Sequence, residues 1–120
     1  MTYTEIAEVA YYACREARKI MLHDGSLDKE WWDLTSQTKK DYVAGVEYVM
    51  NNRTNTPAQV HEGRITYLKN QGWLYGEETN HKLRISSDIV SYDKLPKEKK
   101  VDVHLFTGVV LSLVLALDTI

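Results

Sequence analysis

The sequence predicts a mainly α protein, a small single-domain helical fold of about four helices with a loop-rich or short β-hairpin insert. Apolar residues recur every three or four positions in four segments, and a specific helix-start signal opens the third of these. The periodicity is lost between residues 73 and 92. With 120 residues, 43% of them hydrophobic, the chain is long enough for one core and too short for two, so residues 1–120 form one domain.

The first helix is expected to begin at a threonine cap, Thr2 or Thr4. Asp24-Gly25-Ser26 is expected to end it. Its apolar side chains follow the helical spacing: Ile6, Val9, Ala10, Ala13, Ala17, Ile20 and Met21.

The second helix is expected to begin near Thr35 or Ser36 and to run to about Asn51. Just before it, Trp31 and Trp32 are adjacent, so at most one of them can face inward on a helical turn. We expect Trp32 in the core and Trp31 at the surface.

The third helix has the most specific start signal in the chain. Thr56-Pro57-Ala58-Gln59 reads as a capping box with proline at the first helical position. This helix is expected to bury Ile65 and Leu68 and to stop at Gly72. Short extended pieces at residues 73–75, 82–85 and 88–90 then predict a small hairpin or an irregular loop.

The final helix is expected to open at Pro96 and to continue through Leu117. Residues 109–117 are hydrophobic nearly all round, but the run is far shorter than the roughly 20 residues that span a bilayer. Such a helix needs burial on more than one side. It is therefore either the central helix of the monomer or a subunit contact, and we expect a homo-oligomer (dimer or higher) with no membrane association.

Charge and cysteine content exclude several classes of protein. A net charge of −2 gives no bulk field toward a nucleic acid polymer. The single cysteine, Cys14, lies in an apolar-patterned segment, which excludes a disulfide framework, favours a small core residue over a reactive thiol and indicates a reducing cytoplasm. Charged residues among the first twenty positions interrupt any signal-peptide apolar region.

Catalytic patterns are sparse. The four histidines show no metal-ligand spacing, and the chain has neither a phosphate loop nor a nucleophile elbow. Ser86-Ser87 with His81 could be drawn as nucleophile and base, but nothing in the sequence orients them. We therefore expect that this protein is not an enzyme and has no catalytic residue, metal site or cofactor.

A binding site is better supported, because aromatic and cationic residues gather on loops next to a helix start. Aromatic faces stack on bases, and Arg or Lys neutralises phosphates. The predicted ligand-binding residues are His61, Arg64, Trp73, Tyr75, Lys82, Arg84, Ser86 and Tyr92. For Trp73, Tyr75 and Tyr92 a purely structural role is an equal alternative.

The spacing of several motifs resembles that of the RyR domain, a module named after the repeats of ryanodine receptors and also found alone in bacterial and phage proteins. His61 is followed by Gly72-Trp73-x-Tyr75-Gly76 and then by Tyr92-Asp93-x-Leu95-Pro96. Flanking similarity at Trp32-Asp33 and at residues 97–102 extends the resemblance over roughly the whole chain. It implies the RyR-domain fold and, from the paired receptor repeats, a cleft associated with adenine nucleotides.

The chain departs from the family pattern at two places. The family's His-x-x-Trp pair keeps its histidine as His61, but the tryptophan position is Arg64. The family's His-Pro position corresponds to Ser86-Ser87, with Arg84 just before it. These exchanges suit a more highly charged, phosphate-bearing ligand, or alternatively mean that the family site is lost.

Together these observations predict a non-enzymatic binding protein for a small nucleotide-derived ligand, an ADP-ribose-like or cyclic nucleotide signal. Because the chain carries no effector domain, sequestration of a host immune messenger by a phage-encoded sponge is the simplest use. The alternative is a protein-interaction module or inhibitor that docks a host protein through its aromatic loop and C-terminal helix. A nucleotide site requires a concave cationic pocket, whereas docking requires an apolar patch.

Overall fold

The computed structural model describes residues 1–22 and 29–118, so the predicted helix end at Asp24-Gly25-Ser26 lies outside the described residues. The described part is mainly helical, which confirms the predicted fold class. Its elements in chain order are α1 (Tyr3–Leu22), η1 (Trp31–Asp33), α2 (Ser36–Asn51), α3 (Pro57–Asn70), β1 (Leu74–Tyr75), β2 (Ile85–Ser86), η2 (Tyr92–Lys94), α4 (Lys97–Ser112) and η3 (Val114–Ala116), where η denotes a 3₁₀ helix.

The predicted helix starts are confirmed by their caps. Thr2 and Glu5 cap α1 reciprocally, each side chain accepting the other residue's backbone N–H. Thr35 caps α2 through its hydroxyl. Thr56 and Gln59 form a complete capping box at α3, with the proline in the first turn. These contacts satisfy N–H groups that would otherwise lack partners at each helix start.

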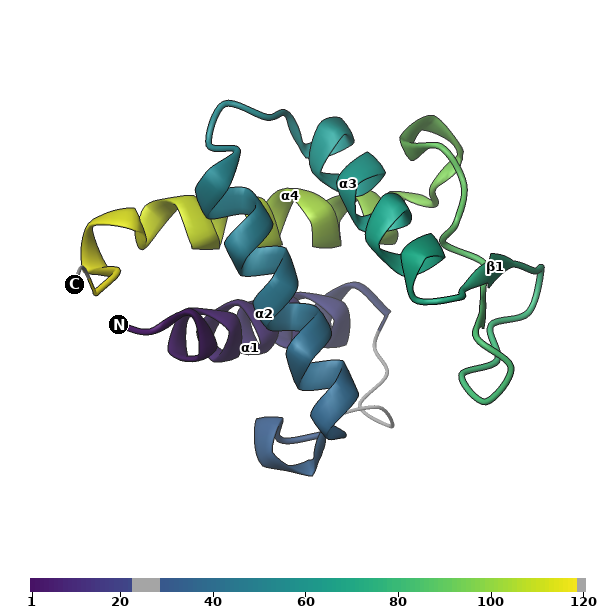
Figure 1. Cartoon of the computed structure of the whole chain (residues 1–120), viewed down its shortest axis with the longest axis horizontal. Coiled ribbons are helices and arrows are strands. Elements are labelled where there is room, and N and C mark those ends of the chain that lie inside the picture. Colours follow the sequence, from purple (N-terminus) through teal and green to yellow (C-terminus); the bar gives the residue numbers. More distant parts are fainter. Residues whose placement is uncertain (23–28, 119–120) are drawn as a thin grey trace.

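The four helices pack in a crossed arrangement (Figure 1). Helices α1 and α4 lie side by side and antiparallel: the Cys14 thiol is near the carbonyl of Asp102, and the Met1 amine contacts the carbonyl of Ala116. Helix α2 crosses both, and α3 lies beyond it with the irregular insert at one end of the molecule. Met1 and the turn that contains Ala116 therefore meet at the end of the molecule opposite the insert.

One main core joins the helices, and a smaller one lies beneath the insert. The main core consists of Ile6, Ala7, Ala10, Tyr11, Trp31, Val46, Val49, Met50, Val60 and Val110. The smaller one consists of Ile65, Leu68 and Ile89, with Tyr67 and Trp73 packed against it. Burial of Ile65 and Leu68 by α3 confirms that prediction.

The tryptophan assignment made from sequence is wrong. Trp31 is the buried residue, with 7% of its surface exposed, whereas Trp32 is 68% exposed. The Trp31 ring packs against the rings of Tyr11 and Tyr42, and its backbone N–H donates to the Tyr12 hydroxyl at 2.9 Å. This segment is a single 3₁₀ turn held by α1. The Tyr12 contact, and not a continuous helical period, therefore decides which tryptophan points into the core.

The last helix is shorter than predicted. Helix α4 ends at Ser112, and a separate 3₁₀ turn follows at Val114–Ala116, so Leu117 is not helical. The Ser112 hydroxyl donates to the carbonyl of Val109 at 2.6 Å, and such local side-chain bonds compete with continued helix. Among the described residues, no helix is long and apolar enough to cross a membrane.

Helix α4 has the position of a central helix in the monomer, because it contacts α1, α2 and α3. Thr107 and Val110 are its fully covered residues. Val101, Leu105 and Gly108 lie on a side that the other helices leave open.

The insert is loop-rich, and its strands do not form a hairpin. β1 and β2 are two residues each and pair in parallel, with Leu74 beside Ile85 and Tyr75 beside Ser86. Residues 82–84 form a turn, and residues 88–90 are not a strand. A β-carbon on Gly76 would lie 2.2 Å from a methyl group of Ile85, so this close strand approach requires glycine.

Gly72 ends α3 as predicted. Its φ of +89° lies in the left-handed region that glycine adopts without strain. The N–H of Trp73 donates to the carbonyl of Leu68, and that of Gly72 donates to Lys69, both at 3.0 Å. This is a Schellman motif, and the packing of Trp73 on Leu68 is its usual apolar contact. The motif thereby fixes Trp73 in its position against the smaller core.

Cys14 is buried, as predicted for a small core residue. Burial is the main cause that raises the pKa of its thiol to about 12, the charge of Asp102 adds to this, and Arg18 opposes it. The thiolate, which is the reactive form, is therefore scarce in the folded protein at neutral pH.

We expect Cys14 to react with alkylating reagents about a thousandfold more slowly in the native protein than in urea at the same pH. Because the folded pKa lies above the unfolded one, folding stabilisation from this thiol is complete below pH 9 and is lost as pH rises toward 12. Urea unfolding at pH 8.5, 9.5 and 10.5 should therefore give a steeper loss for the native sequence than for Cys14→Ala. Identical slopes would contradict the shifted pKa.

Candidate functional site

His61 is held inside the protein by a backbone contact. The residue is 2% exposed on α3, and its Nε2 lies 2.8 Å from the carbonyl oxygen of Val90. Because a carbonyl can only accept, Nε2 carries the proton and donates it. His61 Nδ1 is buried and has no hydrogen-bond partner among the described residues. The ring therefore ties α3 to the segment just before η2, which makes it a positioning group.

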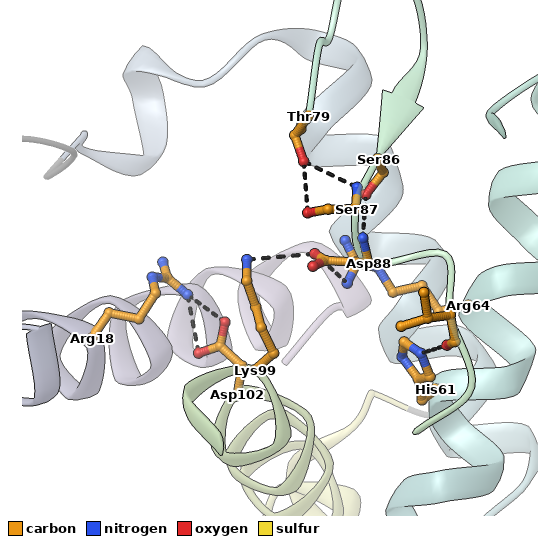
Figure 2. Close-up of polar contacts among 10 residues, drawn as sticks. Arg18, His61, Arg64, Thr79, Ser86, Ser87, Asp88, Lys99 and Asp102 are labelled. Carbon is orange, nitrogen blue, oxygen red and sulfur yellow. Dashed lines mark hydrogen bonds and ion pairs between the residues drawn. The ribbon is translucent and has the colours of Figure 1, made fainter. Parts of the chain in front are cut away.

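Beside the hydrogen bond of His61, two cations converge on one carboxylate (Figure 2). Arg64 from α3 approaches Asp88 Oδ2 at 3.9 Å, and Lys99 from α4 approaches the same oxygen at 3.5 Å. The Asp88 side chain is 16% exposed, whereas those of Arg64 and Lys99 are 56% and 43% exposed. Both cations thus keep much of their surface open to solvent.

Hydroxyl groups border this cluster on the insert side. Ser86 is buried, and its Oγ accepts the backbone N–H of Asp88 at 3.1 Å, which shapes the turn that presents the carboxylate. Ser87 and Thr79 share a hydroxyl hydrogen bond at 3.1 Å, and the Ser87 N–H donates to the same Thr79 oxygen. Ser86 therefore has a structural role, and Ser87 and Thr79 are the hydroxyls nearer the surface.

A third ion pair lies beside these two. Arg18 from α1 donates to both carboxylate oxygens of Asp102 on α4, at 2.9 and 3.2 Å (Figure 2). Burial raises the pKa of Asp102, and Arg18 and Lys99 offset only part of that effect. Burial also acts to lower the pKa of Arg18, but the Asp102 charge and hydrogen bond outweigh it, so the net shift is upward. Lys99 and Arg64 both influence Asp102, so the three ion pairs form one network.

We call Arg18, Arg64, Asp88, Lys99 and Asp102 the charge network. It joins α1, α3, α4 and the segment after β2. It contains three cations and two carboxylates, which is a local excess of positive charge in a chain whose net charge is −2.

The predicted ligand residues fall into three places. His61, Arg64 and Ser86 lie at or next to the charge network. Trp73, Tyr75, Lys82 and Arg84 belong to the insert, and Tyr92 lies against α4.

In the insert, Trp73 is half-buried and meets His81 edge-on at 5.5 Å, while Tyr75 is 55% exposed. Lys82 is exposed in the turn before β2. Arg84 has a φ of +54°, which is strained for a residue with a side chain, and its guanidinium donates to the carbonyl of Gln71. That contact bridges the insert to the end of α3.

Tyr92 is also committed to a contact within the protein. Its hydroxyl lies 2.6 Å from His104 Nε2, and the Lys100 ammonium lies 5.3 Å from the centre of its ring. These contacts support a structural role for Tyr92, which was the alternative to ligand binding.

Sequence reasoning missed Arg18, Asp88, Lys99 and Asp102. The spacing of Lys99 and Asp102 on one side of a predicted helix was the available local signal. Nothing in the sequence pairs Arg18 with Asp102, which is 84 positions away. Asp88 lies in the segment where periodicity gives no information.

Two shallow surface hollows lie elsewhere. One, of about 450 Å³, is lined by Tyr48, Asn55, Ala58, Gln59, Glu62, Gly63 and Thr66. The other, of about 530 Å³, is lined by Lys97, Lys100, Val101, His104 and Leu105 on α4. Neither is lined by a predicted ligand residue. Within residues 1–22 and 29–118, no group of three or more His, Cys, Asp or Glu side chains is placed to hold a metal ion.

Comparison with known proteins found no matching family model, no matching curated protein and no matching solved structure.

Proposed function

We propose that this protein binds a small, phosphate-bearing, nucleotide-derived ligand without converting it, and that Arg64 and Lys99 hold the phosphate. The observation that carries the proposal is their convergence on Asp88 from two helices, at 3.9 and 3.5 Å. Charge-assisted hydrogen bonds between such groups are typically about 2.7–2.9 Å long. Both ion pairs are therefore loose, and both cations have donors available for another anion.

In this proposal Asp88 is a placeholder for the ligand: its carboxylate pairs with the two cations when no ligand phosphate is bound. A phosphate group carries more charge and more acceptor oxygens than a carboxylate, so it competes favourably for the same two cations. The Arg18–Asp102 pair supports the arrangement from one side, because it holds α4 against α1 next to Lys99. Ser87 and Thr79 offer hydroxyl groups on the insert side.

The nucleotide character of the ligand is supported by the aromatic side chains of the insert and by the resemblance to RyR domains. Tyr75 is half-exposed and free to stack on a base. An ADP-ribose-like molecule or a cyclic nucleotide has both the base and the phosphates that this combination would recognise. Sequestration of such a signal by a phage-encoded sponge remains the simplest biological use.

Arg64→Ala is expected to weaken nucleotide binding by about 1.5–3 kcal/mol, because a charge-assisted hydrogen bond is lost. Asp88→Asn is expected to strengthen binding, because the competing carboxylate loses its charge. The measurement is a thermal-shift screen of the native protein with NAD-derived and cyclic nucleotides, followed by calorimetric titration of each variant with the best one. At a hundredfold excess over Kd, binding should add about 2.7 kcal/mol of stability.

Lys40→Ala serves as the matched control, since Lys40 is an exposed cation on α2, a helix that contributes no residue to the charge network. Unchanged affinity in folded Arg64→Ala would remove the network from the site. Weaker binding in Asp88→Asn would contradict the placeholder role. Chromatography of the recovered nucleotide completes the test, because a degraded product would make this protein an enzyme.

Protein docking is the second candidate, and one observation favours it. Leu74, Tyr75 and Leu83 expose 69%, 55% and 67% of their surfaces within the insert. Exposed apolar groups gathered on one small element are typical of a docking surface. If no nucleotide stabilises the protein, this surface becomes the leading candidate for the functional site.

A further inference from the structure

The two cations of the candidate phosphate site share a single negative charge. Arg64 and Lys99 each make their closest approach to the same oxygen, Asp88 Oδ2, at 3.9 and 3.5 Å (Figure 2). Within residues 1–22 and 29–118, neither cation has another ion-pair partner. Two positive charges are therefore matched by one carboxylate.

The neighbouring groups do not supply the missing charge. Asp102 is the other carboxylate of the charge network, but Arg18 donates to both of its oxygens, at 3.2 and 2.9 Å. Cys14 and Tyr42 lie within electrostatic reach of this pair. Burial is the main cause that raises the pKa of Cys14 to about 12, and burial likewise raises the pKa of Tyr42, so both groups are neutral at pH 7.

Asp88 is also a competitor that stays beside the cations. Its backbone N–H donates to Ser86 Oγ at 3.1 Å, and the next residue, Ile89, is buried in the smaller core. A tethered group of this kind acts at an effective concentration on the order of millimolar or higher. A ligand with one charge brings no more charge than Asp88 and must compete against this advantage. A ligand with two charges gives each cation a negative charge of its own.

We infer that the ligand of this site presents two negative charges close together, on two adjacent phosphates or on one terminal phosphate, and that a singly charged phosphodiester binds weakly. The inference rests on the proposed function and narrows its ligand class. An ADP-ribose-like molecule carries two charges on its diphosphate, whereas a cyclic mononucleotide carries one. The charges around Asp88 therefore favour the first of these two classes.

The test compares three nucleotides that have the same base, by calorimetric titration of the native protein at constant ionic strength. At pH 7.5, ADP-ribose and AMP should bind about tenfold or more tightly than cyclic AMP, because each cation gains a charge-assisted contact. The second ionisation of a phosphate monoester has a pKa of about 6, so at pH 5 AMP keeps its shape but loses one charge. Its affinity should then fall toward that of cyclic AMP, while ADP-ribose, which keeps both charges, serves as the control for any change in the protein.

Three variants assign the preference to the two cations. Lys99→Gln leaves one cation, which one charge can match, so the preference for ADP-ribose over cyclic AMP should largely disappear. Asp88→Asn removes a competitor that opposes both nucleotides, so both should bind more tightly and the preference should remain. Lys40→Gln, at an exposed lysine of α2, should change neither affinity.

The outcomes separate this inference from the proposed function. Cyclic AMP that binds as tightly as ADP-ribose, or AMP that binds equally at pH 5 and pH 7.5, would overturn the inference and leave phosphate binding intact. An unchanged preference in Lys99→Gln would also overturn it, because a lysine that only positions Asp88 would alter both affinities by the same factor. No binding of these nucleotides or of pyrophosphate would overturn the proposed function and the inference with it.

Discussion

Replacing Trp31 by alanine is expected to lower the free energy of unfolding by about 3–5 kcal/mol. The side chain is 7% exposed and packs between the rings of Tyr11 and Tyr42, with ring centres 5.8 and 6.0 Å away. Its removal loses the burial of a large apolar surface and leaves a cavity that neighbouring rings fill only in part. The measurement is urea unfolding followed by circular dichroism.

The neighbouring residue provides the control for this prediction. Trp32→Ala removes the same side chain from a position that is 68% exposed, and should cost no more than about 0.5 kcal/mol. Should Trp31→Ala fail to fold, Trp31→Phe keeps part of the packing and should still be less stable than Trp32→Phe. Equal losses at the two positions would mean that the segment before α2 packs differently.

The second large effect is expected at His61. His61→Ala should cost about 2–4 kcal/mol, because it opens a cavity and leaves the carbonyl of Val90 buried without a donor. His61→Gln should recover part of the loss, since its amide can donate to the same oxygen. His81→Ala, at an exposed histidine of the insert, is the control and should change stability little.

The same variants separate structure from recognition. If His61 only positions the segment that carries Asp88, His61→Gln should restore ligand affinity along with stability. Full stability combined with lost affinity in His61→Gln would instead return this histidine to the ligand site. Denaturant unfolding and calorimetric titration on the same protein samples make the distinction.

Helix positions were predictable from the sequence because their signals are local. The capping box at Thr56 and Gln59 and the glycine at position 72 act within one turn of the chain, and each is satisfied as predicted. The errors arose where a local period was extended too far. Trp31 and Trp32 were assigned as if on a regular helix, and α4 was continued past Ser112, where a side-chain hydrogen bond and the contact of the chain ends intervene.

The candidate site was predictable only in part. Residue type identified Arg64 as a cation suited to phosphate, and its position on α3 is as predicted. Residue type could not tell that His61 is buried or that Ser86 is bound to its own turn. An imidazole or a hydroxyl can bind a ligand or form a hydrogen bond to the protein's own backbone equally well. Only the surrounding chain decides which of these two roles the side chain has.

The helices, their caps and the loss of period in the insert follow from the sequence, because they depend on interactions among residues a few positions apart. Tertiary structure alone decided which tryptophan is buried, where Arg18 meets Asp102, and how Arg64 and Lys99 come to share Asp88. These contacts join α1, α3, α4 and the insert across long stretches of chain. Their geometry is set by the packing of whole helices, which leaves no mark at the level of neighbouring residues.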